Sequence, residues 1–262
     1  MINSVAKALD ILALFHTGEP TLTLTEISRR LGMPKSTAHH LLMTMAHYGF
    51  IEQIDGGSYA LGKRIIALTQ NVLVNVELRD RAAPLLRALA DSCNESVYLT
   101  VRDDQRVLYI YAIESPQRLL ARTAVGDHAP MYCTSVGKAV LAYLAPDEIE
   151  RMYADQALHA YTPYTLTDLE ALRRDLALTH TRGYAIDNQE HELHTYCIGA
   201  PVFDAYGRVV GACSISGIDQ AIVGARLDAL ASGVVGTAQE ISRRMGYVPA
   251  RMSMVRPYNN KG

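Results

Sequence analysis

Residues 23–59 constrain the fold more than any other stretch, because they carry the start and stop signals of two short helices. Thr23 and Glu26 have the spacing of a capping box, in which each side chain bonds the other residue's backbone N–H. Gly32 can end the first helix in the left-handed conformation that glycine adopts at low cost. Pro34 suits the first turn of a second helix, where its missing N–H would be unpaired anyway. We therefore expect two helices joined by a tight turn.

The second of these helices, expected over residues 34–48, has two contrasting faces. Helical spacing predicts a buried stripe made of Ala38, Leu41, Leu42 and Met45. The opposite face carries small hydrogen-bond donors and imidazoles in place of the Glu and Lys of an ordinary solvated face. Such side chains can reach base edges and phosphates in a major groove. The predicted DNA contacts are Lys35, Ser36, Thr37, His39, His40 and Thr44.

A hairpin is expected directly after this helix. Residues 50–54 and 58–61 read as strands, and Asp55, Gly56 and Gly57 form a turn that tolerates positive φ. An apolar helix over about residues 5–15 would support the other two helices. Helix, turn, helix and hairpin in this order indicate a winged helix-turn-helix.

Two halves of the chain resemble the IclR family of transcriptional regulators. Residues 4–12, 22–37 and 59–62 are similar to the family's DNA-binding half. Residues 132–139, 182–187, 197–204 and 211–217 are similar to its effector-binding domain. The resemblance implies a C-terminal domain with a GAF-like antiparallel sheet, which binds small organic or aromatic acids. It also implies that this ligand controls affinity for an operator.

The 262 residues suggest two domains of ordinary size. We expect a winged helix-turn-helix over 1–62, a linker helix over 63–80, an effector-binding domain over 81–248 and a polar tail over 249–262. Strands and helices without strict βαβ alternation predict an α+β fold for the second half. The N-terminus has no signal-peptide core, and no run is apolar enough to span a membrane, so we expect a cytoplasmic protein. Four widely spaced cysteines without a CxxC pair argue against a zinc ribbon or a disulfide framework.

Three places in the second half are candidates for an effector site. Residues 134–137 open a helix, whose free N–H groups favour an anion, although Thr134 alone would also explain a simple cap. Ser214 and Ser216 lie two apart on a strand and therefore face the same side, although their neighbours show no clear alternation. The resemblance implies that the ligand is bordered by Ser135, Val136, Asp187, Cys197, Ser214 and Ser216. Arg118 lies in the loop that would close the pocket, and it replaces an apolar residue common in the family, which favours a more anionic ligand.

Two alternatives use the segment 187–197. Cys197, His191 or His194, and Asp187 have the residue types of a thiol hydrolase, which would use the helix-turn-helix for assembly. Asp187, Glu190, His191, His194 and Cys197 are also plausible zinc ligands, but their spacing matches no known pattern closely. The regulator interpretation is preferred, with no enzyme activity, no cofactor and no metal expected.

The charge balance indicates how DNA would be bound. The net charge is −2, and residues 1–80 carry seven basic and seven acidic side chains. A nearly neutral head binds phosphates weakly by itself, so useful affinity requires a homodimer or homotetramer on a repeated duplex site. His40 replaces an Arg that is common in the family, and an unperturbed imidazole is mostly neutral at pH 7. Phosphate attraction at that position is therefore weaker.

Overall fold

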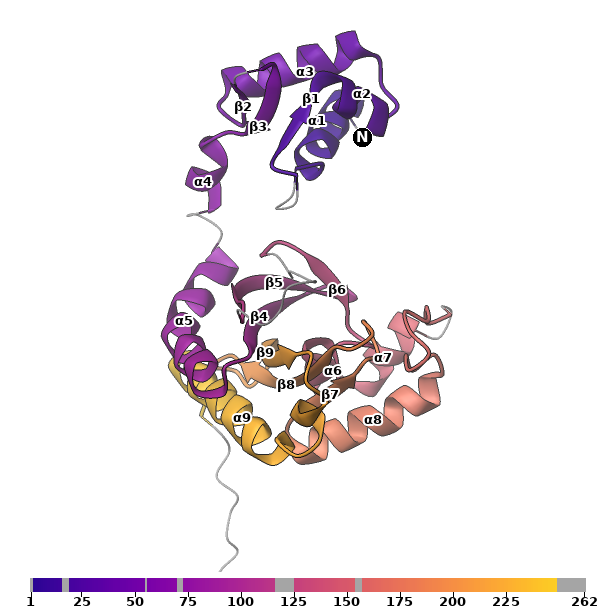
Figure 1. Ribbon diagram of the computed structural model, residues 1–262, viewed down its shortest axis with the longest axis vertical. Helices are drawn as coiled ribbons and strands as arrows, with labels where there is room; N and C mark the ends of the chain where they lie inside the picture. The colour runs from indigo at the N-terminus through magenta and orange to yellow at the C-terminus, as the bar shows by residue number, and fades with distance from the viewer. Residues whose placement is uncertain are drawn as a thin grey trace, which may run out of the picture. The chain divides into compact units, whose positions relative to one another are not determined.

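The computed structural model describes residues 2–15, 19–54, 56–69, 73–115, 125–153 and 157–248. The chain divides into two compact units, Met1–Val76 and Glu77–Gly262 (Figure 1). None of the helices within the described ranges has both the length and the apolar character needed to cross a membrane.

The first unit is a three-helix bundle with a small sheet. Its elements are α1 (Asn3–Ala13), β1 (Thr21–Thr23), α2 (Leu24–Arg30), α3 (Lys35–His47), β2 (Ile51–Ile54), β3 (Ser58–Leu61) and α4 (Arg64–Thr69). The strands pair antiparallel in the order β1-β3-β2. The hairpin β2–β3 is the predicted wing, and β1 is a third strand that the sequence did not predict.

The predicted local signals are present in this unit. Thr23 caps α2: the Glu26 N–H donates to the Thr23 hydroxyl at 3.3 Å, and the Thr23 N–H donates to the Glu26 carboxylate at 2.8 Å. Gly32 adopts φ +59° between α2 and α3. Gly56 and Gly57 turn the hairpin with φ +86° and +79°. These three features fix the helix-turn-helix and its wing by local chemistry.

The buried stripe of α3 is also confirmed. Ala38, Leu42 and Met45 are buried and pack in one core with Ile11 of α1 and Ile27 of α2. Leu41 is half-buried at the edge of that core. The helix therefore has a single packed side within its unit.

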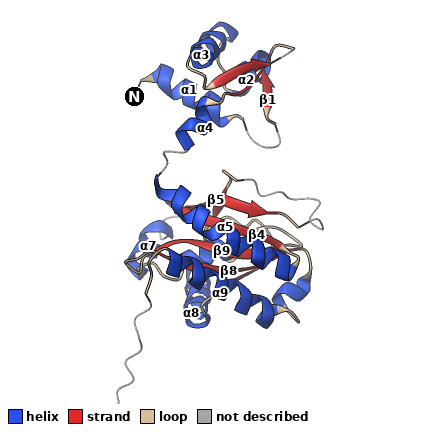
Figure 2. Cartoon of the chain, turned by 90° about the vertical axis from the view of Figure 1, so that its left-hand side faces the viewer, coloured by secondary structure: helices blue, strands red, loops and turns tan. Residues whose placement is uncertain are grey.

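The second unit is built around one antiparallel sheet of six strands. Its elements are α5 (Leu73–Cys93), β4 (Ser96–Asp103), β5 (Arg106–Ile113), β6 (His128–Pro130), α6 (Ser135–Leu141), α7 (Pro146–Tyr153), α8 (Leu169–Arg182), β7 (Ala185–Asn188), β8 (Tyr196–Phe203), β9 (Val209–Gly217), a 3-10 turn (Gln220–Val223) and α9 (Leu227–Arg244). The strand order is β6-β5-β4-β9-β8-β7. Figure 2 labels β5, β4, β9 and β8 of this sheet. This architecture confirms the predicted α+β fold.

Helices cover both faces of this sheet. Helices α5 and α9 pack on one face against residues such as Leu99, Ile198 and Ile215. Helices α6, α7 and α8 form a second core on the other face, which Ala212 joins. Because both faces are covered, β9 is buried on both sides from Gly211 to Gly217.

Helix α5 runs through Pro84 at the cost of one intrahelical hydrogen bond. Asp168 caps α8 by accepting from the Ala171 N–H at 2.9 Å. The last helix starts at Leu227, since the preceding residues form the separate 3-10 turn.

The capping box gives the first testable prediction. Thr23→Ala removes the acceptor for the Glu26 N–H and should destabilise α2 by about 1 kcal/mol. Amide hydrogen exchange over residues 24–30 should become about fivefold faster as local opening becomes easier. Thr21→Ala, which changes a non-capping residue of β1, is the matched control and should leave exchange in α2 unchanged. Equal exchange in all three proteins would show that the box contributes nothing to helix stability.

Candidate effector cavity and DNA-binding face

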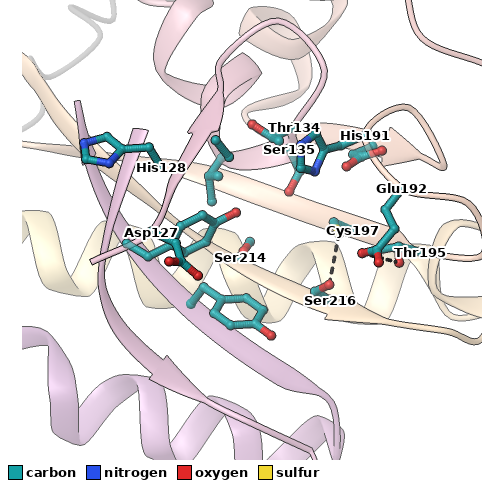
Figure 3. A pocket seen from close by; sticks show the side chains of 15 residues that line it. Asp127, His128, Thr134, Ser135, His191, Glu192, Thr195, Cys197, Ser214 and Ser216 are labelled. Carbon is teal, nitrogen blue, oxygen red and sulfur yellow. Dashed lines mark hydrogen bonds between the residues drawn. The ribbon is translucent and has the colours of Figure 1, made fainter. Parts of the chain in front are cut away.

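A cavity of about 270 Å³ opens on the α6 side of the sheet. It lies where the N-terminal end of α6 meets the loop that follows β7 (Figure 3). Its walls carry mostly hydroxyl, carboxylate and imidazole groups. The lining residues are Tyr98, Tyr109, Asp127, His128, Ala129, Thr134, Ser135, Val136, Asp187, His191, Glu192, Thr195, Cys197, Ser214 and Ser216.

Six of the seven predicted effector residues line this cavity. Strand pairing explains why they meet: Cys197 of β8 lies opposite Ser216 of β9, and Asp187 of β7 lies opposite Cys197. The Cys197 thiol donates to the Ser216 hydroxyl at 3.0 Å (Figure 3). Ser214 and Ser216 both point into the cavity, while Ile215 between them faces the α5–α9 core. Arg118, the seventh residue, lies outside the described part of the chain.

The start of α6 is fixed against the sheet. The Thr134 hydroxyl accepts from the Gly137 N–H at 3.2 Å and donates to the Pro130 carbonyl at 2.7 Å. A Cβ at Gly199 of β8 would lie 2.7 Å from the Ser135 carbonyl carbon, so glycine is needed for this close approach. The first backbone N–H groups of a helix have no partner within the helix. In α6 these include the N–H groups of Ser135 and Val136, and both residues line the cavity.

Asp187 is held at the buried end of β7 by its own loop. Its carboxylate accepts from the Glu190 N–H at 2.7 Å. The hydroxyls of Thr162 and Thr165 hold the same loop, donating to the carbonyls of Gln189 and Glu190 at 2.6 Å each. Burial, reinforced by the charge of Glu190, raises the pKa of Asp187 to about 7. Asp187 therefore changes charge near neutral pH.

A buried cation lies behind this wall. Lys138 of α6 is only 1% exposed, and its Nζ lies 2.5 Å from Glu190 Oε1 and 2.9 Å from Asp175 Oδ2. Burial acts to lower the pKa of Lys138, but the two carboxylates outweigh it and raise that pKa. Lys138 is therefore charged, and its ion pairs join α6 to α8 and to the loop carrying Asp187.

Sequence reasoning missed much of the cavity wall. Tyr98 pairs with Ser214 across β4 and β9, and its ring meets that of Tyr109 edge-on at 5.5 Å. His128 begins β6, which was not predicted, and Asp127 directly precedes it. Side chains alternate along β4, so Tyr98 must face the cavity side because its neighbours Val97 and Leu99 face the opposite core. That signal becomes readable only once β4 is known to pair with β9.

The charge of the cavity is unusual for an acid-binding site. Its described lining includes three carboxyl groups, Asp127, Asp187 and Glu192, but neither Lys nor Arg. Burial lowers the pKa of His191, which keeps this imidazole neutral at pH 7. Arg118, the one cation among the predicted effector residues, lies outside the described ranges.

The alternatives for residues 187–197 gain no support from the geometry. Cys197 donates to Ser216, and Asp187 accepts from Glu190, so neither of these bonds is directed at a histidine. His194 is exposed and adopts φ +60°. Across the described residues, no group of three or more His, Cys, Asp or Glu side chains is arranged to hold a metal ion. All four cysteines are buried, and none of them forms a disulfide.

The predicted DNA contacts lie on the unpacked face of α3. Lys35, Ser36, His39, His40 and Thr44 are exposed, and Thr37 is half-buried. The Thr44 hydroxyl donates to the His40 carbonyl at 2.8 Å. The face opposite the packed stripe is therefore open to a partner outside the unit.

The buried ion cluster gives a second prediction. Lys138→Met keeps the side-chain length but leaves Glu190 and Asp175 buried without their cation. Removing one partner of a buried ion pair costs about 3–5 kcal/mol. Arg151→Met, which breaks the exposed pair with Asp147, should cost at most about 0.5 kcal/mol. Urea denaturation followed by circular dichroism measures both, and equal losses would mean that the cluster is no stronger than a surface pair.

Comparisons with known proteins identify both units. Residues 4–55 match the family model of the IclR helix-turn-helix domain, and residues 70–243 match the bacterial transcriptional regulator IclR C-terminal domain. The chain is 32% identical to the HTH-type transcriptional regulator XynR of Escherichia coli (strain K12), over 94% of this chain and 98% of XynR. It is 31% identical to the transcriptional repressor IclR of the same organism, over 94% of this chain and 90% of that protein.

A solved structure shows the same fold with a ligand. An IclR homolog from Microbacterium hydrocarbonoxydans, complexed with 4-hydroxybenzoate, matches with a TM-score of 0.84 and 25% identity, over 93% of this chain and 99% of that chain. The relatives are regulators of transcription rather than enzymes, so the hydrolase alternative is not favoured. The chain belongs to the IclR family of transcriptional regulators, with a DNA-binding helix-turn-helix domain followed by an effector-binding domain.

Proposed function

We propose that this regulator is a homo-oligomer whose operator affinity is controlled by a small organic or aromatic acid bound in the α6 cavity. The observation that carries the proposal is the convergence of Ser135, Val136, Asp187, Cys197, Ser214 and Ser216 on one cavity. The related protein that was solved with 4-hydroxybenzoate supports an acid as the ligand class. We assign DNA binding to residues 1–62 and effector binding to residues 81–248, with residues 63–80 as the linker.

The lining favours an acid that also carries hydroxyl groups. Its carboxylate would accept from the N–H groups of Ser135 and Val136 and from the hydroxyls of Ser214 and Ser216. Its hydroxyl end would meet Asp187, which is neutral below its pKa of about 7. Arg118, as part of a closing loop, would add the positive charge that the described lining lacks.

The DNA-binding proposal rests on the exposed face of α3. Lys35, Ser36, Thr37, His39, His40 and Thr44 would contact bases and phosphates of the major groove. With seven basic and seven acidic residues in 1–80, one head attracts phosphates weakly, so a dimer or tetramer would bind a repeated site. The relative named a transcriptional repressor supports repression as the mode of control.

One experiment tests the whole proposal. A preferred duplex is first selected from a random library with the full-length protein. Fluorescence anisotropy then measures the affinity for that duplex with and without small hydroxylated acids, starting with 4-hydroxybenzoate. The proposal expects sequence-specific binding and a change of at least fivefold caused by one of the acids. Specific binding that no acid alters would reject the proposal that an effector controls DNA affinity. Absence of specific binding would reject the proposal that the protein recognises an operator.

Lys35 gives a prediction for the DNA-binding face. Lys35→Ala should weaken binding to all duplexes similarly, because a phosphate contact carries no sequence information. The slope of log K against log salt should become flatter by about one unit. Arg151→Ala removes one exposed charge from α7 of the other unit and should leave the slope unchanged. An equal loss for Lys35→Ala at every salt concentration would contradict the phosphate contact.

Asp187 gives a prediction for pH. A carboxylate ligand should bind best while Asp187 is protonated, because ionised Asp187 adds a further negative charge to the cavity. Affinity for 4-hydroxybenzoate should therefore fall between pH 6 and pH 8, by up to about tenfold per pH unit above the pKa. Asp187→Asn stays neutral, so it should keep the affinity of pH 6 and lose this dependence.

Asp187→Ala is the companion variant. It removes the ligand contact as well as the charge, so calorimetry should show weaker binding at every pH from 6 to 8. DNA affinity without ligand should be unchanged in both variants, because Asp187 lies in the second unit. If the affinity of the unaltered protein stays constant or rises over this pH range, ionised Asp187 does not oppose ligand binding and its proposed role is wrong.

A further inference from the structure

A second and larger cavity lies at the far end of α6 and β8. Its volume is about 570 Å³, within the range of small-molecule pockets. It is enclosed by the end of α6, the cap of α8, strand β8, helix α9 and the residues after α9. The lining residues are Tyr143, Gly183, Ala200, Pro201, Phe203, Val235, Gly236, Ala238, Gln239, Glu240, Ser242, Arg243 and Tyr247. None of them lines the effector cavity.

Three aromatic rings form an apolar wall in this second cavity. Phe203 stacks on Tyr247 at 5.1 Å and meets Tyr143 edge-on at 5.0 Å. Backbone contacts hold the first two in place: the Phe203 N–H donates to the Ser242 hydroxyl at 3.0 Å, and the Tyr247 N–H donates to the Ser242 carbonyl at 2.9 Å. The wall is therefore formed before any ligand binds.

Gly236 of α9 opens directly onto the cavity. Glycine inside a helix is unfavourable relative to alanine and usually marks a close approach. A Cβ at Gly233, one turn away, would lie 3.3 Å from Leu89 of α5, so packing accounts for that glycine. A Cβ at Gly236 would meet nothing within 4 Å. The contacts of this unit do not explain Gly236, whereas an occupant of the cavity would.

A cluster of two arginines and one glutamate beside the second cavity carries a net positive charge. The Glu240 carboxylate accepts two hydrogen bonds of 2.8 Å from Arg243 and one of 3.0 Å from Arg244. These bonds lower the pKa of Glu240, so it is ionised. Two cations around one carboxylate leave one positive charge in excess, and Arg243 is the cation that lines the cavity.

We propose that this cavity is a second ligand site, distinct from the effector cavity, for a soluble monocarboxylate with an apolar body. The apolar part lies against Tyr143, Phe203 and Tyr247, over the bare backbone at Gly236. The carboxylate lies at the rim, where Arg243 and Arg244 exceed Glu240 by one charge. An aliphatic chain of about eight carbons or a fused aromatic ring fits this combination of volume and charge.

Calorimetric titration of octanoate into the full chain tests the site, with octanol as the uncharged probe. The unaltered protein should bind one octanoate per chain, at least tenfold more tightly than octanol. Gly236→Leu fills the cavity from a helix position with free space, and it should weaken octanoate binding at least tenfold. Because leucine is a far better helix former than glycine, its melting temperature should be equal or higher, which excludes misfolding as the cause.

Two further variants sharpen the result. Ser232→Leu adds the same side chain at an exposed position of α9 that does not line the cavity, and it should bind octanoate like the unaltered protein. Arg243→Gln should reduce the preference for octanoate over octanol to less than threefold. Octanoate binding that Gly236→Leu leaves intact would place the ligand elsewhere and overturn the proposal. No octanoate binding, with a mass by light scattering that falls in Gly236→Leu, would overturn it in favour of an interface between copies.

Discussion

The second unit depends on a charge that it has removed from water. Lys138 stands in α6, which is buried along its whole length, and a lone ammonium there would cost several kcal/mol. Glu190 and Asp175 compensate it, and they come from different parts of the chain, the loop after β7 and helix α8. The need to neutralise one cation thus fixes three elements together. The effector cavity lies between two of them, so its shape follows from this electrostatic requirement.

The two-sided burial of the sheet explains the chemistry of that cavity. On the face covered by α5 and α9, side chains such as Leu99 and Ile215 pack without polar atoms. On the other face, α6 covers the sheet incompletely near its N-terminal end, and Ser214, Ser216 and Tyr98 line the remaining space. Buried hydroxyls are stable only when they find partners. The Tyr98 hydroxyl donates to the Glu114 carboxylate at 3.1 Å, and the Ser216 hydroxyl accepts from the Cys197 thiol at 3.0 Å. These two wall groups are therefore polar and hydrogen-bonded within the unit.

Local chemistry made the first unit predictable. The Thr23 box, the turn at Gly32 and the hairpin glycines each act within a few residues, so their outcome can be read from the sequence. The same holds for Thr134 at the start of α6. Six of the seven predicted pocket residues line one cavity, but the family resemblance, not periodicity, selected Asp187 and Cys197. Their roles toward a ligand remain predictions.

Long-range pairing set the limit of prediction. Tyr98 reaches the cavity because β4 pairs with β9, more than 100 residues later in the chain. Lys138 pairs with Glu190, which is 52 residues away in the sequence. The residues next to Lys138 in the sequence do not indicate that its side chain will be buried. Strands β1 and β6 are three residues each, too short for an alternating pattern. These features depend on tertiary packing, which local sequence signals do not encode.

The buried cluster also bears on how such a sensor can diverge. Exchange of Ser214 or Ser216 strands no charge: it alters one wall group, and at Ser216 it also removes the acceptor of the Cys197 thiol. Exchange of Lys138 is far more costly, since it leaves Glu190 buried without its cation. Ligand preference can therefore change through single substitutions in the cavity wall, whereas a change of Lys138 requires a change of its partner as well. A new specificity is reached more easily through the hydroxyl-lined wall than through the ion cluster that supports it.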